Sequence, residues 1–223
     1  MKPYKNKQMM RILAANQLKN FLIYSDMTTN YSFIKRSLDI CLSILGIFLT
    51  LPFYLVIYIL IKREDGGPVI FKQERIGYGG KPFTIYKFRS MVIAAEKDDK
   101  PLLCEKNDKR MTKVGYYLRE HHLDEIPQLW NILKGDMSLV GPRPERKYFV
   151  DRIISVNPDY ELLYKLRPGI FSPATLYNGY TDTMEKMLER LRMDLEYMRN
   201  RSFWLDVKII YLTLASLLTG KKF

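Results

Sequence analysis

The stretch "ICLSILGIFLTLPFYLVIYILI", residues 40–61, contains no charged side chain and decides what kind of protein this chain forms. A run of roughly 20 such residues is the length that a helix needs to cross the hydrocarbon core of a bilayer. A secretory signal peptide has a shorter apolar core followed by small residues at a cleavage site, and neither feature is present. The stretch therefore predicts a membrane segment that the protein retains.

Charge and proline placement favour a segment whose two ends lie on the same side of the membrane. Lys35 and Arg36 precede the apolar run, and Lys62 and Arg63 follow it. Because lysine and arginine prefer the cytoplasmic side, this symmetric distribution favours cytoplasmic ends. Pro52 removes a helical hydrogen bond near the middle of the run and predicts a kink. We expect a re-entrant helix-break-helix segment, with an ordinary kinked span as the alternative.

Asp39 lies at the edge of the run, one turn after Lys35 and Arg36. An unpaired charge near hydrocarbon is costly, so we expect Asp39 to pair with one of these cations at headgroup depth. Residues 1–34 mix basic and apolar side chains. They fit either an amphipathic helix on an anionic membrane surface or a partly disordered extension.

Length and charge limit the remaining possibilities. The 223 residues can hold one substantial domain with a small appendage. A net charge of +12 implies an anionic partner, which composition leaves open between nucleic acid, an anionic bilayer and phosphorylated small molecules. Cys41 and Cys104 do not have the spacing of a metal site, which fits a reducing, cytosol-facing location.

The chain after the apolar run predicts an α+β domain that is predominantly helical. Two β-rich runs, residues 68–77 and 81–91, flank a glycine-rich turn and predict a small antiparallel hairpin. Apolar residues at helical spacing after Thr183 predict an amphipathic helix. The tail starts with two aromatics and ends with two lysines before a final phenylalanine, and we place it in the membrane interface. The expected divisions are an N-terminal extension (1–34), a re-entrant membrane helix (35–63) and a cytosolic catalytic domain with interfacial C-terminal helices (64–223).

Asp124 and Glu125 stand in "HHLDEIPQLWN", residues 121–131, where a helix is expected to begin. Asp124 as N-cap, an apolar face at Ile126, Leu129, Trp130 and Leu133, and a stop at Gly135 would explain the pair structurally. Neighbouring basic residues favour chemistry instead. Arg119 and Arg143 lie in the same stretch of sequence, and alternation in the hairpin brings Lys87 and Arg89 to one face. Adjacent acids, guanidinium groups and a divalent cation together suit the binding of phosphates.

Several motifs in order, "IKRSLDI", "GPVIFKQERIG", "FTIYKFRSM", "LREHHLDEIPQLWNILKGDMSLVGPRPE" and "KLRPGI", carry a specific resemblance. From about residue 33 to residue 220 the chain resembles the bacterial sugar transferase family, small monotopic phosphoglycosyl transferases that begin the assembly of surface polysaccharides and glycoproteins. The resemblance implies Mg²⁺-dependent transfer of a sugar-1-phosphate from a UDP-sugar to polyprenyl phosphate. It also implies release of UMP at the cytoplasmic face of the bacterial inner membrane, among its lipids.

The resemblance further implies roles for individual residues. Asp124 would be the nucleophile that forms an aspartyl phospho-sugar, and Glu125 would assist the metal or orient Asp124. Both carboxylates, Asp124 and Glu125, are expected to hold Mg²⁺. The residues expected to bind substrate are Lys87, Arg89, Arg119, Pro142, Arg143 and Arg167. The segment Phe171-Ser172-Pro173 departs from the Thr-Gly-Trp of many members and predicts a somewhat different donor pocket.

Two other classes of function compete with the enzyme. A membrane-tethered basic protein that binds nucleic acid or acidic lipid, or a structural membrane scaffold, would also account for the charge and the tail. No aromatic stacking platform with a nucleic-acid motif is evident, so we expect no nucleic-acid partner. The sequence leaves open which sugar is transferred, which glycan pathway is served and whether the chain forms a homodimer.

Overall fold

The computed structural model describes residues 3–93, 95, 101–103, 108–177 and 181–219, with side chains described between residues 31 and 216. Cys104 and the end of the C-terminal tail lie outside the described residues. The chain divides into two units, Met1–Leu38 and Asp39–Phe223. The first unit is the N-terminal part of helix α1 (Pro3–Asp65), and the second contains the rest of α1 and all the other elements.

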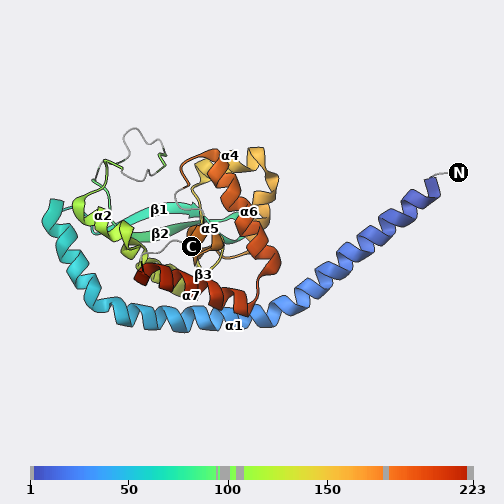
Figure 1. Ribbon diagram of the computed structural model, residues 1–223, viewed down its shortest axis with the longest axis horizontal. Helices are drawn as coiled ribbons and strands as arrows, with labels where there is room; N and C mark the ends of the chain where they lie inside the picture. Colours follow the sequence, from blue (N-terminus) through green and yellow to red (C-terminus); the bar gives the residue numbers. More distant parts are fainter. Residues whose placement is uncertain (1–2, 94, 96–100, 104–107, 178–180, 220–223) are drawn as a thin grey trace. The chain divides into compact units, whose positions relative to one another are not determined.

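The second unit has the predicted α+β character, predominantly helical with little sheet (Figure 1). A two-stranded antiparallel sheet pairs β1 with β2, and a two-stranded parallel sheet pairs β3 with β4. The elements after α1 run in the order β1 (Ile70–Ile76), η1 (Tyr78–Gly80), β2 (Pro82–Phe88), α2 (Lys113–Glu120), η3 (Leu123–Glu125), α3 (Gln128–Lys134), β3 (Ser138–Val140), α4 (Lys147–Val156), η4 (Pro158–Lys165), β4 (Gly169–Phe171), α5 (Pro173–Tyr177), α6 (Met184–Asn200) and α7 (Phe203–Thr219).

Helix α1 continues through Pro52 instead of breaking there. It bends in its light-blue to cyan part in Figure 1, as expected where a proline removes a hydrogen bond. The Thr50 hydroxyl donates to the carbonyl of Gly46 at 2.7 Å, a contact that also bends helices. The expected break is thus a bend within one helix, and the re-entrant placement in a bilayer stays a prediction.

One narrow stripe of α1 packs on the rest of the second unit. Asp39, Ser43, Ile57 and Ile61 are buried, and Tyr54 meets Phe88 edge to face with ring centroids 4.9 Å apart. The spacing of these positions by three, four and seven or more residues keeps them on one helical face. Around this stripe the large apolar side chains are exposed: Ile44, Leu45, Phe48, Leu49, Leu51, Phe53, Leu55 and Val56.

The hairpin forms as predicted. Ile70 pairs with Phe88 and Ile76 with Pro82, so β1 and β2 match residue for residue. Gly79 and Gly80 at the turn have φ of 69° and 70°, values that glycine adopts without strain. The register places Lys87 opposite Phe71, near the end of the hairpin that is remote from the turn.

Helix α3 differs from the expectation in its start and in its buried face. It begins at Gln128, after the separate turn η3, so Asp124 is not its N-cap. Trp130 is 56% exposed, whereas Gln128 and Asn131 are almost completely buried. Of the expected apolar face, Ile126 and Leu129 are partly buried and pack against the core, whereas Trp130 does not. Gly135, with φ of 91°, ends the helix as predicted.

The Asn131 side chain explains this orientation. Its amide nitrogen donates to the Thr84 carbonyl at 2.7 Å, and its oxygen accepts from the Tyr86 backbone N–H at 3.1 Å. The side chain thus satisfies backbone groups at the edge of β2, where no third strand pairs. A polar residue takes the core position because the sheet edge requires it, and Trp130 turns outward.

Candidate active site

Asp124 and Glu125 lie in η3, a single turn between α2 and α3, and both are buried. His122 precedes the turn with φ of 54°, a left-handed conformation that is uncommon for residues other than glycine. This reversal ends α2 and directs the two carboxylates toward the hairpin. Both His121 and His122 are exposed, and His121 Nδ1 contacts the Tyr117 carbonyl at 3.0 Å.

Glu125 is the acceptor for two cations. Lys87 Nζ lies 2.6 Å from Glu125 Oε1, and Arg143 donates to the same carboxylate at 2.5 and 3.3 Å. Burial alone would raise the pKa of Glu125, but Arg143 and Lys87 outweigh it and hold this pKa well below its ordinary value. Glu125 is therefore ionised in the folded protein and fixes both cations at the site.

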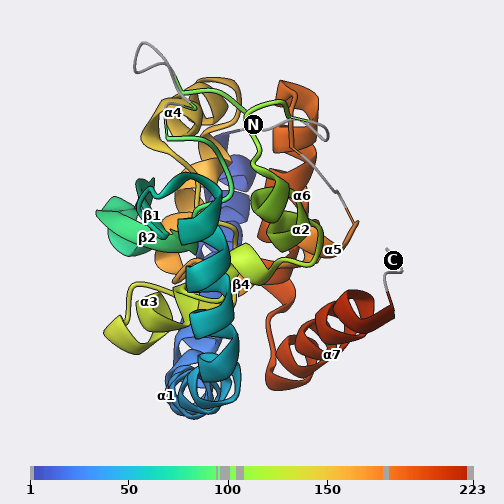
Figure 2. The same ribbon diagram turned by 90° about the vertical axis from the view of Figure 1, so that its left-hand side faces the viewer.

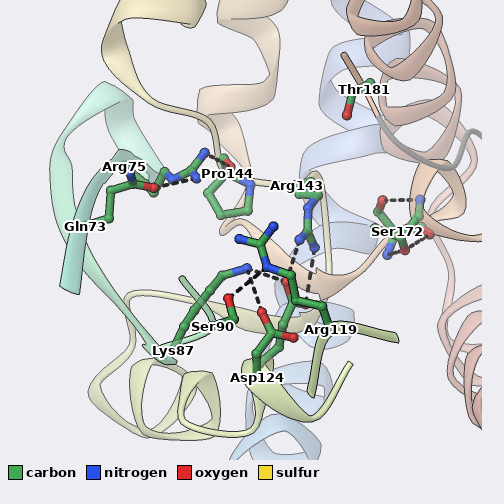
Figure 3. A network of polar contacts seen from close by, with 12 residues as sticks. Gln73, Arg75, Lys87, Ser90, Arg119, Asp124, Arg143, Pro144, Ser172 and Thr181 are labelled. Atoms are coloured by element: carbon green, nitrogen blue, oxygen red, sulfur yellow. Dashed lines mark hydrogen bonds and ion pairs between the residues drawn. The ribbon is translucent and has the colours of Figure 1, made fainter. Parts of the chain in front are cut away.

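Asp124 has weaker compensation for its charge. Its Oδ2 lies 3.8 Å from Lys87 Nζ (Figure 3), whereas Glu125 lies 2.6 Å from the same nitrogen. Burial raises the pKa of Asp124, Lys87 opposes the shift and the Glu125 charge adds to it. A carboxylate whose ionised form is poorly stabilised is more basic and more nucleophilic than one bound by several donors.

Arg119 approaches the pair from α2. Its Nε donates to Ser90 Oγ at 2.8 Å, and the charge of Arg119 lowers the pKa of Asp124. Gly115 lets α2 come close to this point, because a Cβ there would lie 2.0 Å from the Ser90 carbonyl oxygen. Figure 3 places Lys87, Arg119 and Arg143 around Asp124.

The other residues expected to bind substrate lie in different surroundings. Arg89 is buried and pairs with Asp65 at the end of α1. Pro142 is buried and its carbonyl accepts from the Gly169 backbone N–H at 2.9 Å, which helps to fix the segment that carries Arg143. Arg167 donates to the Gly135 carbonyl at 3.0 Å and lies over the Tyr78 ring, at the turn of the hairpin.

The backbone of Arg167 lies beside Gly141, next to the segment that carries Arg143, while its side chain contacts Gly135 and Tyr78. Its role in binding substrate stays a prediction.

Asp39 has a structural partner in the second unit. Its Oδ1 accepts from the Leu139 backbone N–H at 3.0 Å, and the side chain is 4% exposed. Asp39 thereby joins α1 to β3. The expected pairing with Lys35 or Arg36 at headgroup depth stays a prediction.

The donor set fits a divalent cation that is shared with substrate phosphates. Mg²⁺ commonly uses one or two protein carboxylates and takes its remaining ligands from phosphates and water. Asp124 suits this role because its charge is only weakly compensated by the protein. Glu125 suits it less well because both its oxygens already accept from cations. Among the described residues no three His, Cys, Asp or Glu side chains form a ready metal cage.

Comparison with known proteins matches residues 30–220 to the family model described as bacterial sugar transferase, which covers most of the chain. The chain belongs to the bacterial sugar transferase family. The matched range includes the whole carboxylate and arginine cluster described above.

The names of three curated relatives describe transferases of sugar phosphates that act on undecaprenyl phosphate. The chain is 48% identical to a UDP-glucose:undecaprenyl-phosphate glucose-1-phosphate transferase of Klebsiella pneumoniae, over 80% of this chain and 39% of the relative. It is 42% identical to a UDP-N-acetylgalactosamine-undecaprenyl-phosphate N-acetylgalactosaminephosphotransferase of Aeromonas hydrophila, over 85% of this chain and 45% of the relative. A putative undecaprenyl-phosphate N-acetylgalactosaminyl 1-phosphate transferase of Bacillus subtilis is 43% identical, over 70% of this chain and 86% of the relative. The chain thus spans less than half of the first two relatives and most of the third.

Proposed function

We propose that this bacterial sugar transferase moves a sugar-1-phosphate from a UDP-sugar to undecaprenyl phosphate, through a covalent intermediate on Asp124, and so starts the assembly of a surface glycan. The observation that carries the proposal is a buried, poorly compensated carboxylate beside Lys87, Arg119 and Arg143. The names of the relatives support the substrate classes.

The proposed reaction has two displacements at one phosphorus atom. An Asp124 carboxylate oxygen attacks the phosphorus that bears the sugar, the bond from this phosphorus to the oxygen of UMP breaks, and UMP leaves. An oxygen of undecaprenyl phosphate then attacks the same phosphorus, and the bond to Asp124 breaks. The products are undecaprenyl diphospho-sugar and the original carboxylate, and no proton transfer is required.

The surrounding residues reduce the repulsion between an anionic nucleophile and an anionic donor. Glu125 holds Lys87 and Arg143 beside Asp124, so positive charge is in place before the donor binds. Ser90, two residues after the end of β2, accepts a hydrogen bond from Arg119 and holds it. When bound, Mg²⁺ would supply further positive charge to the donor phosphates, and Asp124 and Glu125 are the carboxylates that would hold it.

Attachment of α1 at both ends supports a monotopic location, and the lysines and arginines that flank the apolar segment favour the cytoplasmic face of the inner membrane. Asp39 binds the β3 backbone, and Glu64 accepts from the Lys113 backbone N–H at 2.7 Å at the start of α2. Both ends of the apolar segment therefore contact the same unit. A segment that crossed the membrane would place its ends about 30 Å apart on opposite sides of the hydrocarbon core.

Exposed apolar surface supports the same placement. Within the described part of the chain one helix, Tyr31–Asp65, is long and apolar enough to cross a membrane, and only 11% of its most apolar window is buried. Figures 1 and 2 both place α7 and the part of α1 from Asp39 to its bend along the lower side of the second unit. Helix α7 exposes Phe203, Trp204, Val207, Tyr211 and Leu214, including aromatics of the kind that settle at the headgroup level.

The test is UMP release by the full-length protein in detergent micelles or nanodiscs, with undecaprenyl phosphate and a panel of UDP-glucose, UDP-galactose and UDP-N-acetylgalactosamine. We expect turnover with at least one donor, its loss when Mg²⁺ is chelated, and its loss in Asp124→Asn. Asp151→Asn is the matched control because Asp151 lies on the exposed side of α4. Activity of Asp124→Asn equal to that of the wild type would exclude the covalent mechanism.

Membrane placement has a separate test. Single cysteines placed before residue 35 and after residue 62 should be labelled from the same side of sealed membranes. Labels on opposite sides would show that α1 crosses the bilayer and would overturn the monotopic placement.

A further inference from the structure

Helix α6 presents a row of polar side chains to the segment that carries Arg143. Arg190, Asp194 and Tyr197 are spaced by four and three residues, so they lie on one face of the helix. All three are buried, at 6%, 2% and 3% exposure. The facing segment, residues 140–145, follows β3, and the Tyr197 hydroxyl contacts its first carbonyl, that of Val140, at 3.5 Å.

Two stronger contacts follow along the same row. The Arg143 backbone N–H faces the Asp194 carboxyl group and, against the effect of burial, lowers its pKa. Arg190 donates to Glu145 Oε2 at 2.9 Å. Residues 190 and 194 on the helix thus hold residues 145 and 143 of the segment, on either side of Pro144.

Glu145 is held from the hairpin side as well. Arg75 of β1 donates to Glu145 Oε1 at 2.5 Å and to the Pro144 carbonyl at 3.4 Å (Figure 3). Burial would raise the pKa of Glu145, but Arg75 and Arg190 lower it to about 2. The segment is therefore held between β1 and α6 by the contacts of Arg75 and Arg190 with Glu145. The Arg143 side chain extends from this segment to Glu125.

The buried Asp194 side chain lowers the stability of the fold, which a purely structural role would not require. Its Oδ1 is buried without a hydrogen-bond partner among the described residues, and burial raises its pKa to about 7. A buried carboxylate with incomplete bonding costs stability, and an apolar side chain of similar size would pack there at lower cost. The carboxyl group faces the backbone N–H of Arg143, a polar group that an apolar side chain could not interact with.

We infer that α6 sets the position of Arg143 at the carboxylate pair, with Asp194 and Arg190 as positioning residues for the transfer reaction. This inference rests on the proposed function. Asp194 and Arg190 act through Arg143, because their contacts are to the backbone of Arg143 and to Glu145, and not to Asp124 or Glu125.

The experiment is a double-mutant cycle measured by UMP release from the UDP-sugar that supports turnover. Asp194→Ala removes the acceptor, and Asp194→Asn keeps an acceptor oxygen without the charge. We expect Asp194→Ala to lower kcat/KM by roughly tenfold and Asp194→Asn to stay within about threefold of the wild type. In an Arg143→Ala background, Asp194→Ala should cause little further loss, because the group it positions is already absent.

Controls separate this role from a loss of folding. Glu196→Ala, an exposed acid on the same helix, should leave turnover unchanged. If Asp194→Ala does not fold, Arg190→Lys replaces it, since lysine cannot make the forked contacts of Arg190 with Glu145 and Thr181.

Each outcome has a definite reading. Losses that disappear in the Arg143→Ala background support the inference. Losses of equal size with and without Arg143 show that α6 acts only on folding and overturn it. Absence of turnover in the wild type with every donor of the panel would overturn the proposed function, and this inference with it.

Discussion

Replacing Glu125 with glutamine should destabilise the protein in a way that depends on pH. The substitution keeps the shape of the side chain but removes the charge that binds Lys87 at 2.6 Å and Arg143 at 2.5 and 3.3 Å. Breaking a fully buried ion pair costs about 3–5 kcal/mol. The side chains of Lys87 and Arg143 are 17% and 29% exposed, and glutamine keeps one acceptor oxygen, so we expect about 2–3 kcal/mol.

The sign of the pH dependence follows from the lowered pKa of Glu125. The folded protein keeps Glu125 ionised at pH values where the same residue in the unfolded chain already binds a proton. The stabilisation by ionised Glu125 is therefore fully present above 4.5, the ordinary pKa of glutamate. It is lost as the pH falls below this value toward the lowered pKa of the folded state. The gap between the wild type and Glu125→Gln should therefore be widest near pH 7 and narrow in acid.

The assay is thermal unfolding of both proteins in the same detergent at pH 7 and pH 4. For a chain of this size about 1 kcal/mol corresponds to a shift in Tm of roughly 2–4 °C, so Glu125→Gln should melt about 4–12 °C below the wild type at pH 7. Asp151→Gln is a control for loss of an exposed carboxylate. A Tm equal to that of the wild type at pH 7, or a gap that is the same at both pH values, would refute the assignment of Glu125 as the residue that fixes the two cations.

Three further predictions concern the other buried carboxylates. Asp124→Asn should be at least as stable as the wild type near pH 8 because burial raises the pKa of Asp124 and its charge costs stability there; a clearly lower Tm would contradict this. Asp39→Ala leaves the Leu139 N–H without its acceptor and should cost about 1–3 kcal/mol by thermal unfolding, whereas Asp39→Asn should recover most of the loss; equal values for the two variants would argue against the hydrogen bond. Asp194 has a pKa raised from 3.8 to about 7, so its contribution to stability falls as the pH rises between these values. Between pH 4 and pH 8, Asp194→Asn should therefore gain stability relative to the wild type by on the order of 3 kcal/mol. A difference in stability that stays constant over this range would show that Asp194 is not protonated in the folded state.

Local patterns predicted those elements whose signals lie within a few residues. The glycine-rich turn between two β-rich runs predicted the hairpin, and the spacing of methionine and leucine after Thr183 predicted α6, whose N-terminus Thr183 caps. Gly135 predicted the end of α3. These features depend on backbone geometry that the residue itself imposes, so the sequence carries them directly.

The buried face of α3 could not be predicted in this way. Apolar periodicity favoured the face with Trp130, but Asn131 is buried because it satisfies the free edge of β2. Such a requirement appears only when the strand edge and the helix are known to meet. A buried polar residue that serves another element carries no local signal.

The candidate site likewise contains residues that a local sequence signal predicted and residues that have no such signal. Lys87, Arg119 and Arg143 were expected near Asp124 and Glu125, and the structure brings them together. Ser90, Asp194 and Glu145 were missed because their partners lie far along the chain and their own neighbours in sequence give no hint of them. The polar positions of α1, Asp39 and Ser43, were the one usable signal for the face that packs on the protein, since polar groups in an apolar segment rarely face lipid.

The most direct measurement of the central claim is intact and peptide mass spectrometry of the wild-type enzyme, quenched rapidly in acid after mixing with its UDP-sugar in the absence of undecaprenyl phosphate. We expect a mass increase equal to one phospho-sugar on the peptide that contains Asp124, with release of an equal amount of UMP, and the loss of this adduct on addition of undecaprenyl phosphate. Release of UMP during confirmed turnover, with no adduct on Asp124 at any quench time, would contradict the account.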